Sequence, residues 1–206
     1  MAENFFQTKL NRYVMKKRTL MYMLVISGLT FQACSSSNNK PTDDSVKIAE
    51  NDNEVKEEQE AGPEADDSKF VVKAASGGLL EVMLGHMAQE KSQNAQVKEF
   101  ADQMIKDHEK ANSELEALAT LKNITLPTTP GKDQQEDINE IIKLSGADFD
   151  KKYISYMKDD HEADVKEFKS AAQDAKDPSI KEFAAKTLPT LEMHLNMVKA
   201  IDEKLN

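Results

Sequence analysis

The sequence predicts an all-α protein, an antiparallel four-helix bundle with an extra short helix between its second and third long helices. From Ser68 onward, apolar residues recur at steps of three and four, which is the spacing of one face of a helix. The same stretch is poor in Gly and Pro and has no runs of β-branched residues. These 139 residues are enough for one domain.

The four long helices are expected at about residues 69–91, 94–122, 147–176 and 178–204. Ser92 and Asn94 supply a tight turn after the first helix, and Asp177-Pro178 places a capping side chain before a proline suited to a first helical turn. Two tight turns make the first and second helices, and likewise the third and fourth, antiparallel neighbours.

The first long helix is apolar on more than one side. A stripe that includes Phe70, Glu81 and Leu84 competes with one that includes Val72, Met83 and His86. Periodicity alone does not choose between the two stripes.

The short helix is expected at residues 134–144. Asp133 followed by Glu136 resembles a capping box that opens it, and Ser145-Gly146 would end it. Residues 126–131, with two prolines and a glycine, form the one sizeable loop.

Residues 1–33 are predicted to be a signal peptide, with its true start near Met15. A basic cluster at residues 16–18 precedes an apolar run over residues 20–31, which is too short to span a bilayer comfortably. Ala33-Cys34-Ser35 then resembles a bacterial lipobox, in which the cysteine is lipidated and becomes the mature N-terminus. An ordinary thiol or a signal-anchor residue is the alternative for Cys34.

Residues 34–67 are predicted to form a disordered acidic tether between Cys34 and the folded domain at 68–206. Between residues 35 and 67 there are 11 acidic residues and 3 lysines. Such a segment buries too little apolar surface to offset the entropy that ordering removes.

The composition excludes several classes of protein. The chain has 37 acidic and 27 basic residues, a net charge of −10, which argues against nucleic acid as a partner. A single cysteine excludes an internal disulfide, a zinc cage made of cysteines and an iron–sulfur cluster. No nucleophile–base pair or phosphate-binding loop stands out, so the sequence favours a binding protein over an enzyme.

A repeated motif supplies the best functional clue. Met104 and Asp107-His108 in the second helix recur as Met157 and Asp160-His161 in the third. At 1.5 Å per residue, His161 and His194 lie about 25 Å from the turn that joins their helices. His108 and Glu81, measured from the turn between their own helices, lie at positions along the bundle that differ by no more than about 5 Å.

Three histidines and one carboxylate are therefore expected to converge inside the bundle. Glu81, His108, His161 and His194 would be the metal ligands, with four further residues beside them: Asp107, Asp160, Met104 and Met157. Imidazole with carboxylate suits zinc or iron, and imidazole with thioether suits copper. The alternative is that these are core histidines satisfied by neighbouring side chains or water. His86 is expected to face solvent.

Five segments together resemble the bacterial family called domain of unknown function 4142. They are residues 74–85, 97–108, 144–150, 153–161 and 183–194, in order and at fitting spacing. The resemblance implies a ferritin-like four-helix bundle and a location in the cell envelope, and no established activity. Ile105, Lys158 and Leu191 stand three residues before the histidines, where di-iron proteins of this fold carry glutamate, so a ferritin-type di-iron site is not expected.

The sequence thus predicts a lipid-anchored envelope protein, held at the outer membrane and facing the periplasm, that acts as a binding or stress-related module. Its partner would be the membrane, through the lipid on Cys34, and the sequence identifies no protein partner. The alternatives are a periplasmic metal-binding protein or metallo-oxidoreductase that holds Fe, Zn or Cu, and a structural envelope protein.

Overall fold

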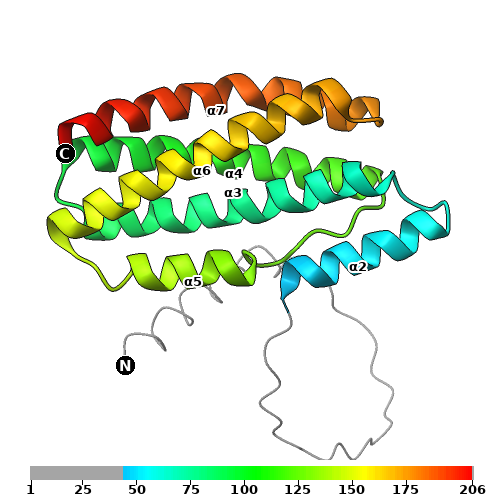
Figure 1. Ribbon diagram of the computed structural model, residues 1–206, viewed down its shortest axis with the longest axis horizontal. Coiled ribbons are helices and arrows are strands. Elements are labelled where there is room, and N and C mark those ends of the chain that lie inside the picture. Colours follow the sequence, from blue (N-terminus) through cyan, green and yellow to red (C-terminus); the bar gives the residue numbers. More distant parts are fainter. Residues whose placement is uncertain (1–43, 206) are drawn as a thin grey trace, which may run out of the picture. The chain divides into compact units, whose positions relative to one another are not determined.

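The computed structural model describes residues 44–205, which form six helices and lie within the second of two compact units of the chain. The predicted signal peptide and Cys34 lie outside the described residues. The helices, coloured from blue to red in Figure 1, are α2 (Ser45–Glu58), α3 (Ala65–Lys91), α4 (Ala95–Leu121), α5 (Lys132–Ile141), α6 (Gly146–Asp174) and α7 (Pro178–Leu205). The all-α prediction is confirmed.

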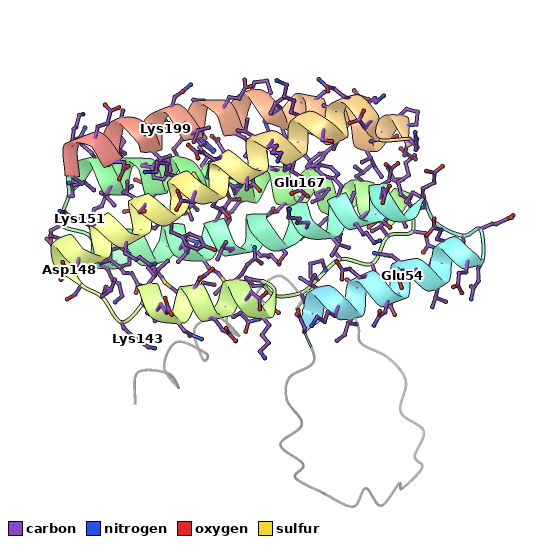
Figure 2. The ribbon with its side chains drawn as sticks, viewed as in Figure 1. Glu54, Lys143, Asp148, Lys151, Glu167 and Lys199 are labelled. Carbon is purple, nitrogen blue, oxygen red and sulfur yellow. The ribbon has the colours of Figure 1, made fainter. Side chains whose placement is uncertain are left out.

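Helices α3, α4, α6 and α7 form the predicted four-helix bundle. The pairs α3–α4 and α6–α7 are antiparallel hairpins, and α3 also packs against α6 while α4 packs against α7. The segment that contains α5 returns the chain from one end of the bundle to the other, so that α4 and α6 run in the same direction on one diagonal (Figure 1). Charged side chains such as Lys143, Lys151 and Lys199 are exposed and point outward (Figure 2).

Helix α3 is buried on two sides, which explains its two competing apolar stripes. The stripe with Phe70, Glu81 and Leu84 is buried, whereas His86 is exposed. Helices α2 and α5 both pack against α3, in addition to its two neighbours in the bundle, α4 and α6. A second side of α3 is therefore covered. Among residues 44–205, α3 is the one helix whose length and composition would allow a membrane span, and 67% of its most apolar window is buried.

The predicted disorder of residues 34–67 is wrong for α2, which lies inside that segment. Asn53 exchanges two hydrogen bonds with the backbone of Thr125, at 2.9 and 2.7 Å. Lys56 donates to the Thr125 hydroxyl at 2.7 Å, and Asp44 caps the helix by accepting from the Val46 amide. Polar pairing to a distant loop holds this helix, and apolar periodicity does not detect such pairing.

The short helix α5 begins earlier than predicted. Its N-cap is Gly131, and the Gln134 side chain accepts from the Gly131 amide, so the predicted box of Asp133 and Glu136 is not the one used. Gly146 does not end this helix but begins α6, with a φ of 58° that favours glycine.

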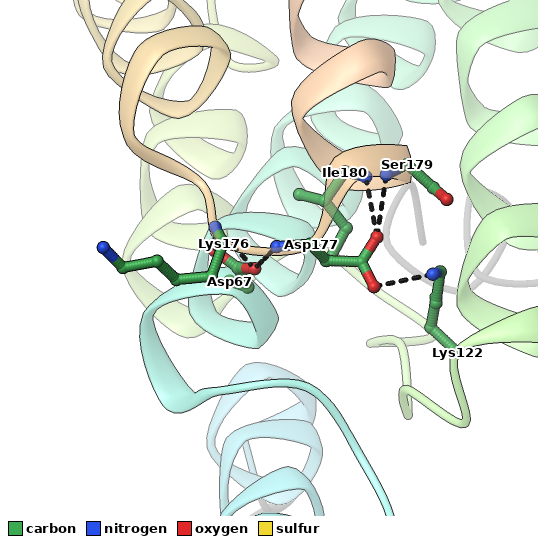
Figure 3. A network of polar contacts seen from close by, with 6 residues as sticks. All are labelled: Asp67, Lys122, Lys176, Asp177, Ser179 and Ile180. Carbon is green, nitrogen blue, oxygen red and sulfur yellow. Dashed lines mark hydrogen bonds and ion pairs between the residues drawn. The ribbon is translucent and has the colours of Figure 1, made fainter.

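A polar network fastens the α6–α7 turn to α3 and to the end of α4 (Figure 3). The Asp67 carboxylate accepts from the amides of Lys176 and Asp177. Asp177 accepts from the amides of Ser179 and Ile180 and pairs with Lys122 at 2.6 Å. Burial opposes ionisation of Asp177, but these donors outweigh it and hold its pKa below the usual value.

Replacing Asp177 with Ala should therefore destabilise the bundle. The change removes an N-cap and the partner of Lys122, so we expect a loss of about 1–2 kcal/mol in the free energy of unfolding. Urea denaturation measures it. Asp102→Ala, at an exposed position of α4, is the matched control. Equal stability of the two variants would show that the network contributes nothing.

Replacing Asn53 with Ala should release α2 and leave the bundle folded. The variant loses both bonds to Thr125 and leaves that backbone to water. Hydrogen exchange of the amides in 45–58 should become at least about tenfold faster, while exchange in α6 stays unchanged. Undiminished protection of 45–58 would mean that other contacts hold α2.

Candidate metal centre

Each of the four long helices contributes one titratable side chain to the middle of the bundle. Glu81 comes from α3, His108 from α4, His161 from α6 and His194 from α7, and all four are buried. The three imidazole ring centres lie 5.2, 5.5 and 5.7 Å apart. The shared depth expected from helical rise is thus what the structure has.

One ring nitrogen from each histidine lies within 4.8 Å of the others. A single ion that binds imidazoles at about 2.0–2.1 Å could contact all three after a small inward movement. Residues from separate helices meet here, so the bundle itself positions the group.

In each histidine, one ring nitrogen has a hydrogen-bond or ion-pair partner. Nδ1 of His161 donates to the Met157 carbonyl at 3.0 Å, because a carbonyl only accepts. Nε2 of His194 lies 3.0 Å from Asp107, and Nδ1 of His108 lies 2.7 Å from Glu81 Oε2. The Met157 carbonyl and the ionised Asp107 accept from His161 and His194, which assigns the tautomers of these two rings, whereas the tautomer of His108 depends on whether Glu81 holds a proton.

The remaining three nitrogens are buried and have no hydrogen-bond partner among the described residues. They are Nε2 of His108, Nε2 of His161 and Nδ1 of His194. In the tautomers assigned above, the nitrogens of His161 and His194 each carry a lone pair, and Nε2 of His108 carries one when Glu81 is ionised. Metal-bound histidines commonly donate their other N–H to a carboxylate or a backbone carbonyl, and each of the three rings has such a group beside that nitrogen.

Glu81 connects the histidines to a second group of possible ligands. Its Oε1 atom lies 3.4 Å from His161 Nε2 and has no hydrogen-bond partner in the described part of the chain. Glu81, Asp160 and His161 each place one ligand atom within 4.8 Å of the others. A proton or a cation between Oε1 and Nε2 would relieve the repulsion of two facing lone pairs.

Burial keeps the histidines neutral. It lowers the pKa of His108 to about 4 and that of His194 to about 4. Burial, reinforced by the neighbouring His108 and His194 rings, lowers the pKa of His161 to about 3. Neutral imidazole is the form that binds a metal, so the site is ready for a cation at neutral pH.

The carboxylates divide into two kinds. Burial raises the pKa of Glu81 well above its usual value, and burial together with Glu81 raises the pKa of Asp160 to about 8. Burial also opposes ionisation of Asp107, but hydrogen bonds from Gln103 and His194 outweigh it and keep its pKa below normal. Asp107 is therefore the ionised carboxylate that orients His194.

The four residues expected beside the ligands have different places in the structure. Asp107 contacts His194, and Asp160 belongs to the group with Glu81. Met157 contacts His161 through its carbonyl, and the side chains of Met157 and Met104 are fully buried.

Two residues near the site were missed in the sequence, Asn112 and Asp164. They lie one helical turn after His108 and His161, respectively, and both line a cavity that Glu81 and His108 also line. Helical spacing from each histidine could have found them.

The three buried histidines should not titrate near pH 6.5, because a lowered pKa means that the neutral ring persists as pH falls. In metal-free protein, we expect their ring resonances to stay constant from pH 8 to about pH 5 and to shift only near pH 4 or below. NMR titration, with each resonance assigned by a His→Gln variant, measures this. Midpoints near 6.5 for all three would show that the rings reach water.

Solved structures with the same fold are similar to this chain over about two thirds of its length. A DUF305 fragment from Deinococcus radiodurans has a TM-score of 0.61 at 12% identity, covering 69% of this chain and 99% of its own. A DUF305 protein from Streptomyces coelicolor, described as a candidate secreted protein, has a TM-score of 0.58 at 12% identity, covering 69% and 96%. CopM in the Cu(II)-bound form has a TM-score of 0.56 at 14% identity, covering 68% and 97%. At these identities the likeness shows the fold alone.

Among curated protein sequences, none is significantly similar to this chain. A family model, in contrast, matches residues 52–201, which include the second half of α2, the whole of α3 to α6, and α7 as far as Ile201. The matched range contains Glu81, His108, His161 and His194. The chain belongs to the family described as domain of unknown function DUF4142.

Proposed function

We propose that this protein binds one transition-metal ion through Nε2 of His108, Nε2 of His161 and Nδ1 of His194. One observation carries the proposal: these three nitrogens are buried and unpartnered, while the opposite nitrogen of each ring faces an acceptor. Leaving three buried acceptors empty costs free energy, and a cation would satisfy all three at once.

Copper(II) is the first choice of ion and zinc(II) the second. Both bind neutral imidazole well, and for a site of given ligands the divalent affinities peak at copper. The solved structure of CopM with Cu(II) supports this choice, because it places copper in a protein of the same fold. Burial favours the protonated forms of Glu81 and Asp160 in the metal-free protein, and a bound cation would favour the loss of their protons, so that both carboxylates add negative charge beside it.

We further propose that the domain works outside the cytoplasm, held by a lipid on Cys34 at the outer membrane and facing the periplasm. The order of a basic cluster, an apolar run and Ala33-Cys34-Ser35 supports this location. Residues 35–43 and the helix α2 would then link the anchor to the bundle. The function that fits is an envelope metal-binding module rather than an enzyme.

Removing one ligand should abolish tight metal binding. Titration of the metal-free protein with Cu(II), followed by elemental analysis, should give one bound equivalent, and His161→Ala should lose it. His86→Ala, which changes an exposed histidine of the same chain, is the matched control and should bind copper normally.

Asp107→Asn should weaken copper binding about 10- to 100-fold, because it weakens the contact that orients His194.

A purely structural role for the histidines would give a different pattern. The wild type would then hold no stoichiometric copper or zinc after dialysis, and His161→Ala would only melt at a lower temperature. Equal copper binding by His161→Ala and His86→Ala would also contradict the proposal.

Lipidation of Cys34 is tested in cells grown with a palmitate analogue. The wild-type chain should be labelled and should partition with membranes, because two or three acyl chains anchor firmly. Cys34→Ala should be unlabelled and soluble after cell lysis. Equal labelling of both chains would show that the lipid is attached at another residue. No labelling of the wild type would show that the chain is not lipidated.

A further inference from the structure

A small cavity lies against one side of the three-histidine cluster. Its volume is about 20 Å³, which is room for roughly one water molecule. Glu81 and His108 form part of its wall, whereas His161 and His194 do not line it. All four bundle helices contribute to the wall, so the cavity lies inside the bundle and borders the cluster at Glu81 and His108.

The rest of the wall is mostly apolar. Leu115, Phe168, Phe183 and Leu191 line the cavity and belong to the main apolar cluster of the bundle. The polar residues of this part of the wall are Asn112, Asp164 and Thr187, so a small molecule in the cavity would meet the cluster on one side and these few polar groups elsewhere.

Asn112 closes the cavity against the backbone of α3. A Cβ atom at Gly78 would lie 2.0 Å from Asn112 Oδ1, so only glycine allows this side chain its place. A Cβ atom at the neighbouring Gly77 would meet nothing within 4 Å. Gly78 and Asn112 thus form a close contact that sets the size of the cavity, and Gly77 does not take part in it.

We propose that the bound metal keeps one open coordination position facing this cavity, which takes a single water-sized ligand, and that Asn112 sets the size limit. The proposal rests on the metal site proposed above. Three protein ligands with a fourth position left open are typical of metal sites that exchange a ligand, whereas closed four-ligand sites are structural. The ligand class is water, hydroxide or a monatomic anion.

Fluoride is the probe for the open position, because it is close to water in size and its nuclear spin splits the EPR lines of copper(II). The full chain is first loaded with Cu(II) and its copper content measured. We expect added fluoride to produce the splitting in the wild type. A copper-loaded wild type that shows no splitting at saturating fluoride would overturn the open position.

Azide, a three-atom anion, tests the size limit. Asn112→Ala should bind azide about tenfold or more tightly than the wild type, because the substitution enlarges the cavity, and the azide-to-copper absorption band reports it. Asn139→Ala, exposed on α5, is the control and should not change azide affinity. Equal azide affinities for the two variants would overturn the role of Asn112.

A pair of glycine variants checks the same contact without deleting the amide. Gly78→Ala must displace Asn112 and should change fluoride affinity several-fold, while Gly77→Ala should leave it unchanged. Identical fluoride affinities for the pair would count against the proposal. Failure of the wild type to hold copper would be seen in the metal assay first, and would overturn the proposed function together with the open position.

Discussion

The burial of three neutral imidazoles at one depth is the constraint on which the rest of the site depends. A polar atom that leaves water must find a partner, and each of these rings satisfies one nitrogen and not the other. Three such atoms near one point would destabilise an ordinary core. A cation bound by all three nitrogens would give each of them the partner that it lacks.

The bundle produces this arrangement because each of its four helices contributes one residue to the site. His108 and His161 lie on diagonal helices that run in the same direction, which is why a shared motif reaches the same depth from both. Helices α2 and α5 cover the outer side of α3 and leave its Glu81 face to the interior. Burial then sets the protonation: the pKa of each histidine falls and that of Glu81 rises.

The fold and the depth of the site could be predicted from the sequence, because both follow from helical spacing and rise. Helical rise also predicted the height of Glu81, but periodicity could not choose its face, since α3 has two apolar stripes and the choice depends on what covers each. The helix α2 was missed because Asn53 holds it by bonding to Thr125, a residue 72 positions away. The ring tautomers depend on side-chain geometry, which a sequence does not contain.

The most direct test of the metal site is X-ray absorption spectroscopy of the protein loaded with one equivalent of copper or zinc. The account predicts three imidazole nitrogens at about 2.0–2.1 Å, recognisable by scattering from their outer ring atoms. That scattering should weaken by a third in a His194→Ala sample that is forced to hold metal. A coordination shell made of oxygen atoms alone would contradict the account.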